Sequence, residues 1–89
     1  MQVKREEDTD LYTIITVKPW PRDLFAPSVS VIWFKHAGER DVRVCCNGGP
    51  GMSHERAFTF AQAILRAVDI AKRLVDKGAI VLEGEDGTR

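Results

Sequence analysis

The chain has no net charge, because its 13 basic and 13 acidic side chains cancel. Proteins that bind nucleic acids draw much of their affinity from Lys and Arg contacts to phosphates, so this balance argues against generic binding to DNA or RNA. No apolar run approaches the roughly 18 residues that a membrane-spanning helix needs, and residues 1–10 lack the apolar stretch of a secretion signal. We therefore expect a cytoplasmic protein with no membrane partner.

Cysteine and histidine are scarce as well, with two residues of each. Cys45 and Cys46 are adjacent, and neighbours in a strand point to opposite faces, so a disulfide between them would be strained. One metal ion could not bind both without distortion, and we expect two free thiols, no metal site and no cofactor. Catalysis by Cys46 with His54 as its base is not favoured, because no third group to orient the histidine is evident.

The length of 89 residues suits one hydrophobic core and is too short for two. An apolar fraction of 44% is that of an ordinary globular protein, so we expect a single domain over residues 1–89. Residues 1–10 mix charges without periodicity and are interpreted as a loose tail or a frayed start to the first strand. The polar residues 84–89 are interpreted as a second loose tail.

Three segments have the composition of strands, namely 11–17, 29–35 and 41–47. Each is rich in β-branched and aromatic residues that alternate between two faces. The short connection around Gly38 predicts that the second and third segments form an antiparallel hairpin. Residues 79–83 form a further short apolar run, and we expect them to add a fourth strand to the sheet.

One long helix is predicted between Ser53, a good N-cap, and Gly78, a residue suited to a left-handed C-cap. Apolar residues recur at helical spacing and predict the face that packs on the sheet. These residues are Ala57, Phe60, Ala61, Ile64, Val68, Ala71 and Val75. The element order β-β-β-α-β therefore predicts an α+β fold, an antiparallel sheet of three to four strands with one long helix packed on one face.

The apolar arc of this helix is wider than a single sheet requires. Phe58 and Leu65 extend it on one flank, and Ala63 and Ile70 extend it on the other. Since large exposed apolar patches are unusual on monomers, we expect something else to cover these flanks.

A glycine-rich segment, residues 47–52 (NGGPGM), joins the third strand to the helix. A strand, a glycine loop and a helix N-terminus together form the arrangement that cradles phosphate groups, which makes this a candidate anion site. Its residues would be Gly48, Gly49, Gly51 and Ser53. A plain connection is the favoured interpretation, because no GxxxxGK or GxGxxG pattern is present and Pro50 lacks a backbone donor.

Residues 47–51 also resemble the HGGPG oxyanion loop of proline iminopeptidases, with asparagine in place of the histidine. Those enzymes need a G-x-S-x-G elbow followed by an acid and a histidine, and this chain has none of that set. We therefore predict a protein that is not an enzyme.

The segment 18–28 holds three prolines together with large apolar side chains, and a stiff loop that presents aromatic residues loses little entropy when it docks. Trp20, Arg22 and Phe25 are the candidate partner-binding residues here. The alternative is that Trp20 and Phe25 fold back over the helix flank at Phe58 and Leu65. A second candidate surface is the uncovered face of the sheet, with residues Tyr12, Ile32 and Phe34.

In layout, residues 11–83 resemble small phage and prophage proteins that inhibit host machinery, anti-CRISPR proteins among them. Some of these also run three short strands, a glycine-containing turn, an alanine-rich helix and a final apolar strand. The resemblance implies a protein-binding module that inhibits a host protein or nucleoprotein complex. Two alternatives stay open, a domain that binds RNA or a nucleotide through the glycine loop and helix N-terminus, and a structural homodimer.

Overall fold

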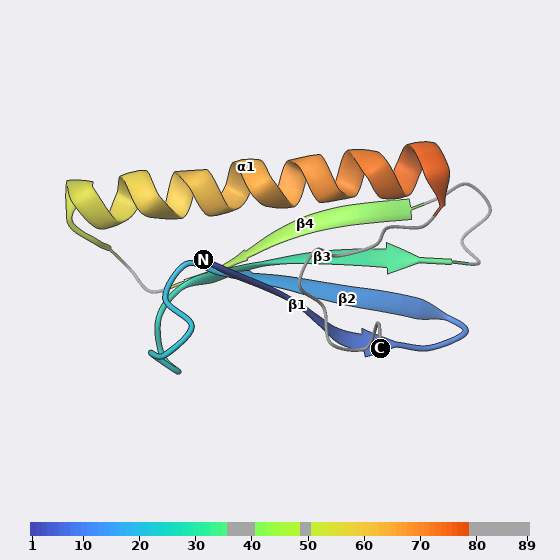
Figure 1. The fold of residues 1–89 in the computed structure, drawn as a ribbon, viewed down its shortest axis with the longest axis horizontal. Helices are drawn as coiled ribbons and strands as arrows, with labels where there is room; N and C mark the ends of the chain where they lie inside the picture. The colour runs from blue at the N-terminus through green and yellow to red at the C-terminus, as the bar shows by residue number, and fades with distance from the viewer. Residues whose placement is uncertain (36–40, 49–50, 79–89) are drawn as a thin grey trace.

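The computed structural model describes residues 1–35, 41–48 and 51–78. Within these ranges four strands are followed by one helix. They are β1 (Gln2–Asp8), β2 (Tyr12–Lys18), β3 (Ser28–Phe34), β4 (Asp41–Asn47) and α1 (His54–Lys77). The strands form one antiparallel sheet in the order β1-β2-β3-β4, and α1 runs along it, in contact with β2, β3 and β4 (Figure 1). The predicted α+β class is confirmed.

The N-terminal segment corrects the sequence prediction of a loose tail. Residues Gln2–Asp8 form the edge strand β1, which pairs antiparallel with β2 and has a register shift between Arg5 and Glu7. The segment looked irregular because only Val3 and Arg5 are half-buried there, and an edge strand tolerates charges at its remaining positions. The predicted strand over 79–83 and the tail at 84–89 lie outside the described residues.

The hydrophobic core lies between α1 and the face of the sheet that it covers. Alternate residues of β2 and β3 point to this face, as the period of two in a strand requires. The fully buried apolar residues are Ile15, Val17, Val29, Val31, Ala63, Ala67, Ile70 and Leu74. Small alanines on the helix let its axis approach the branched side chains of the sheet closely, which fills the space between the layers.

Both ends of α1 have the caps that the sequence predicts. The Ser53 hydroxyl accepts a hydrogen bond of 3.2 Å from the backbone N–H of Arg56, which satisfies one donor of the first turn. At the other end Gly78 has φ 70°, and its N–H donates to the carbonyl of Leu74 at 2.8 Å. A residue with a Cβ would be strained there, so the glycine ends the helix.

The buried stripe of α1 differs from the predicted one. Its fully buried members are Ala63, Ala67, Ile70 and Leu74, whereas Ala57 and Ala61 of the predicted stripe are exposed. At 100° per residue, the buried stripe is rotated by about 100° from the centre of the predicted stripe. Three residues of the predicted stripe, Phe60, Ile64 and Ala71, are half-buried and pack against the border of the core. The sheet covers one side of the wide apolar arc of α1. The prediction had placed the sheet over the middle of this arc.

Candidate functional site

The loop of residues 19–27, between β2 and β3, is ordered by its own hydrogen bonds. The N–H of Asp23 donates to the carbonyl of Trp20 at 3.1 Å, and the N–H of Ala26 donates to the carbonyl of Asp23 at 3.2 Å. The Asp23 carboxylate also accepts from the N–H of Phe25 at 3.1 Å. Two successive turns braced by an aspartate, with proline at both ends, hold this part of the chain in one conformation.

Trp20 anchors this loop to the start of α1. The guanidinium carbon of Arg56 lies 4.1 Å from the centre of the Trp20 ring, which is a close cation–π contact. Trp20 is half-buried, so part of its side chain is covered by neighbouring residues. The loop and the helix N-terminus lie at the same end of the molecule (Figure 1).

Gly48 allows a second close contact at this end of the molecule, between the chain after β4 and the loop of residues 19–27. A Cβ on Gly48 would lie 3.1 Å from the Cβ of Pro27, closer than a side chain can usually approach. Gly48 therefore lets the chain after β4 pass tightly against Pro27 at the end of the loop.

The tip of the loop is apolar and faces solvent. Leu24 is 86% exposed and Phe25 is 96% exposed, the two highest values among the large exposed apolar side chains in the described part of the chain. Phe25 stands at the rim of an open cavity of about 390 Å³ between the loop and the helix N-terminus. Asp23, Ser53 and Arg56 also line this cavity, so its walls carry both charges and a hydroxyl.

The six predicted partner-binding residues fall into two groups rather than one surface. Trp20, Arg22 and Phe25 lie on the loop after β2, and Tyr12 and Phe34 lie at the opposite end of their strands. A seven-residue strand spans roughly 20 Å, so the groups are separated by the length of the sheet. The predicted alternative, in which Trp20 and Phe25 cover Phe58 and Leu65, is wrong, because Phe58 and Leu65 are 68% and 69% exposed.

The second group lies on the sheet face that α1 does not cover. Tyr12 is paired with Phe34 and Ile14 is paired with Ile32 across β2 and β3, so the four side chains form one patch. All are half-buried except Phe34, which is 36% exposed.

Two polar contacts border this patch. The Arg43 guanidinium carbon lies 5.8 Å from the centre of the Phe34 ring, and the Tyr12 hydroxyl donates to Glu7 at 3.4 Å. The Asp41 carboxylate accepts two hydrogen bonds from the Arg43 guanidinium. These hydrogen bonds raise the pKa of Arg43. The patch therefore combines a small apolar centre with mixed charges at its edge.

Three of the four residues of the candidate anion site, Gly48, Gly51 and Ser53, are described by the structure. Gly49 lies outside the described residues, and Gly48 and Gly51 are exposed. The Ser53 hydroxyl is engaged as the helix cap, and the Asp23 carboxylate lines the same cavity. A carboxylate in that position repels an anion, which opposes the attraction of the helix N-terminus.

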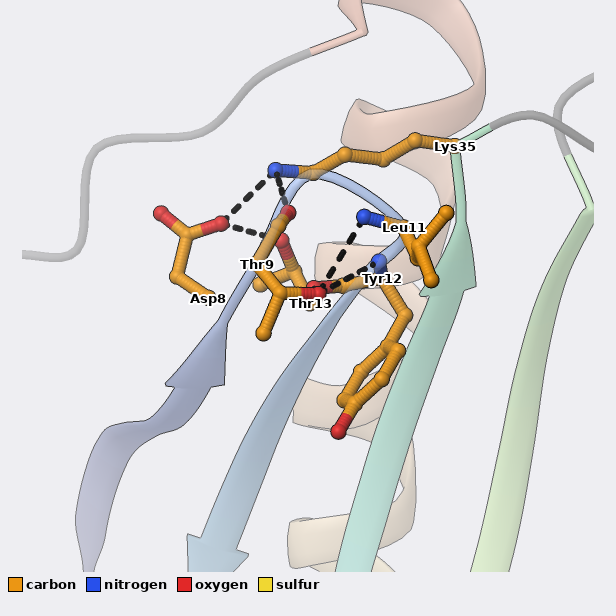
Figure 2. A network of polar contacts seen from close by, with 6 residues as sticks. All are labelled: Asp8, Thr9, Leu11, Tyr12, Thr13 and Lys35. Atoms are coloured by element: carbon orange, nitrogen blue, oxygen red, sulfur yellow. Dashed lines mark hydrogen bonds and ion pairs between the residues drawn. The ribbon is translucent and has the colours of Figure 1, made fainter.

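A polar cluster at the opposite end of the sheet closes the turn between β1 and β2 (Figure 2). The Lys35 ammonium reaches from the end of β3 to the Asp8 carboxylate at 2.7 Å and to the carbonyl of Thr9 at 2.8 Å. Asp8 also accepts from the Thr13 hydroxyl at 2.8 Å. The hydrogen bonds from Lys35 and then Thr13 lower the pKa of Asp8, so its carboxylate stays charged and ties three strands together.

The two cysteines are free, Cys45 half-buried and Cys46 exposed. Their cross-strand partners are Ser30 and Val29, on opposite faces of the sheet. The described ranges hold no group of three or more His, Cys, Asp or Glu side chains placed to bind a metal ion. The one helix in these ranges is not apolar enough to span a membrane.

Sequence reasoning missed two exposed apolar sites. Leu24 adjoins the predicted Phe25 but was not selected, although its position in a proline-rich loop already placed it at the surface. Phe58 and Leu65 were expected to be covered, yet both point to solvent from α1. Their seven-residue separation put them on one face of the helix, and the width of the apolar arc indicated that the sheet would not reach them.

Comparison of the chain with protein-family models, with curated proteins and with solved structures found no match.

Proposed function

We propose that this protein is a non-enzymatic binding module that recognises a protein partner through the tip of the loop between β2 and β3. The observation that supports it is the exposure of Leu24 and Phe25, at 86% and 96%, on a loop that is already ordered. Burying one such side chain is worth about 1.5–3 kcal/mol. Because the loop is braced before binding, little of that free energy is lost to ordering the chain.

The neighbouring residues suit a protein partner. Arg22 is exposed next to the tip, and arginine beside large apolar side chains is a common composition of interface hot spots. Trp20 takes a supporting role in this proposal, since its contact with Arg56 holds the loop in place. The zero net charge of the chain supports a protein partner over a nucleic acid, whose affinity would depend on excess positive charge.

A narrower form of the proposal is an inhibitor of a host nucleoprotein complex. It rests on the resemblance in layout to phage and prophage inhibitors and is tested by the identity of the partner. The alternative in which the glycine loop binds RNA or a nucleotide predicts a different site, centred on Gly51 and Ser53.

The test uses the double variant Leu24→Ser/Phe25→Ser and a matched control, Leu11→Ser. Leu11 is 65% exposed and lies at the other end of the sheet, so the control removes a similar apolar surface away from the loop. All three proteins are immobilised and exposed to a lysate of the native host, and bound proteins are identified by mass spectrometry. Circular dichroism melts establish that the variants are folded.

We expect one protein to bind the unmodified chain and the Leu11→Ser control, and to be lost with Leu24→Ser/Phe25→Ser. Retention of the same partner by the double variant would contradict the proposal. Binding to RNA or to lipid vesicles that persists in the double variant would favour another function, and vesicle binding lost only in the double variant would make the tip a membrane anchor instead.

A further inference from the structure

Two arginines at the loop end of the molecule differ from arginines elsewhere in it. Arg43, Arg66 and Arg73 each lie 3.1 or 3.2 Å from an aspartate carboxylate. Arg22 and Arg56 are exposed, and no carboxylate of the described residues lies within ion-pair distance of either. Two guanidinium groups without an acidic partner in the described part of the chain therefore lie close to the exposed apolar tip.

The Arg56 guanidinium is held in place while its hydrogen-bond donors stay free. Its central carbon lies over the Trp20 ring, 4.1 Å from the ring centre. Cation–π attraction at this distance does not use the N–H groups of the guanidinium. None of the described residues accepts a hydrogen bond from these groups. Arg56 therefore presents the planar fork of donors that binds a carboxylate through two hydrogen bonds.

The free donors of Arg56 open onto the same cavity as the loop tip. Arg56 and Phe25 both line the open cavity of about 390 Å³ at the start of α1. Gly51 also lines it and leaves room there, because a Cβ on this glycine would meet no atom within 4 Å. A partner chain that covers Phe25 therefore brings its neighbouring side chains within reach of Arg56.

We propose that the partner presents an acidic side chain, Asp or Glu, beside a large apolar one. The apolar side chain packs on Leu24 and Phe25, and the carboxylate enters the cavity and accepts hydrogen bonds from Arg56. This inference rests on the proposed function and names the chemistry of the surface that the loop tip recognises. Charge complementarity of this kind sets the register of the partner and disfavours partners with a basic residue at that position.

Asp23 favours a carboxylate over a phosphate as the anion in this cavity. The Asp23 carboxylate lines the cavity and is held there by the N–H of Phe25. Its repulsion grows with the charge of the incoming group, and a phosphorylated side chain carries about −1.5 to −2 at pH 7 where a carboxylate carries one charge. A nucleic acid would bring a row of phosphates to a chain of zero net charge. A single carboxylate with apolar neighbours is therefore the best fit.

The first test is a selection of random displayed peptides against the whole immobilised chain. We expect the recovered peptides to carry Asp or Glu next to a large apolar residue. The control Lys72→Gln removes an exposed positive charge elsewhere on α1, and it should bind the same peptides with unchanged affinity. Recovery of basic peptides, of peptides without an acid, or of none would overturn the inference.

A double-mutant cycle then assigns the acid to Arg56. The acidic residue of the tightest peptide is changed to its amide, and Arg56 is changed to Gln. Each single change should weaken binding about tenfold or more, because it breaks a charged hydrogen-bond pair. Both changes together should weaken binding little more than one alone, since they break the same contact. Additive losses would show that Arg56→Gln acts only by loosening the loop, which would overturn the inference.

Asp23→Asn tests the sign of the charge that the cavity takes. Asparagine keeps an oxygen acceptor for the N–H of Phe25 and removes the repelling charge, so the affinity for acidic peptides should rise severalfold. A fall in affinity would overturn the inference. The loop variant Leu24→Ser/Phe25→Ser separates the two proposals. Acidic peptides that bind this variant unchanged would contradict the proposed function, whereas apolar peptides that need Phe25 but no acid would contradict only the present inference.

Discussion

The two sides of α1 have similar residues and opposite surroundings. Leu74 is 1% exposed on the side that faces the sheet, and Leu65 is 69% exposed on the side that faces solvent. The helix propensity of the residue is the same in both places, so the difference comes from what lies against it. A leucine contributes to folding stability in proportion to the surface that folding removes from water.

The largest expected effect comes from a charge on the buried side. Ile70 is fully buried, and Ile70→Asp would place an unpaired carboxylate against the apolar face of the sheet. We expect loss of the cooperative thermal transition in circular dichroism. The matched change Leu65→Asp should leave a folded monomer, and a folded Ile70→Asp protein would break the comparison between the two sides.

Truncation of the two leucines gives the direct measurement of the same difference. Leu74→Ala removes buried methyl groups and leaves a cavity, so we expect the free energy of unfolding to fall by about 2–5 kcal/mol. Leu65→Ala should change it by less than about 0.5 kcal/mol in the monomer, as is usual at the surface. Urea denaturation at low protein concentration measures both, and equal losses would contradict the assigned faces.

A third environment is found at the start of the helix, where the exposed Arg56 contacts the Trp20 ring and not the sheet. Trp20→Ala should lower the free energy of unfolding by about 1 kcal/mol or more, because it removes this contact and loosens the loop. A double-mutant cycle with Arg56→Ala isolates the contact itself, for which we expect a coupling of about 0.5–1 kcal/mol. Additive effects of the two changes would show that the ring and the guanidinium are independent.

The smallest effect concerns charge rather than apolar burial. The pKa of Asp8 is lowered in the folded protein by Lys35 and Thr13, so its contribution to stability is complete above the unfolded value of about 3.9 and is lost as the pH falls through the folded value. Its side chain is 49% exposed, so we expect Asp8→Asn to lower the free energy of unfolding at neutral pH by only about 0.5 kcal/mol.

Urea melts of the Asp8→Asn protein and the unmodified chain at several pH values check this prediction. The two free energies of unfolding should converge in strong acid, where Asp8 is protonated in both the folded and the unfolded state. A difference that grows as the pH is lowered would show that the sign of the pKa shift is wrong.

Local pattern was sufficient for most of the fold. The alternation in residues 11–17, 29–35 and 41–47 and the caps at Ser53 and Gly78 are properties of short segments. The structure has these three strands and the helix within a residue of the predicted ends. β1 was missed because its strand character comes from pairing with β2 and not from its own composition. Charged side chains are usual on an edge strand, so the sequence of such a strand resembles a solvated tail.

The candidate site was less predictable, because it depends on which apolar side chains are covered by other parts of the protein and which are left exposed to solvent. Trp20 and Phe25 are both aromatic residues of one proline-rich loop, and nothing local indicates that the first contacts Arg56 while the second is exposed. The same holds for the helix, where the periodicity of α1 gave the width of the apolar arc. Which part of the arc meets the sheet is set by tertiary packing.

The order of the elements has a consequence for how the protein folds. Each strand pairs with the strand that follows or precedes it in the chain, so most sheet contacts are local in sequence and the sheet should form quickly. Among the described elements the helix follows the strands, and Ile70 and Leu74 are separated from Ile15 by more than half of the chain. During synthesis the apolar face of the sheet therefore exists before its cover does. Until residues 63–74 emerge, we expect that apolar face to be exposed to water and available for contacts with other chains.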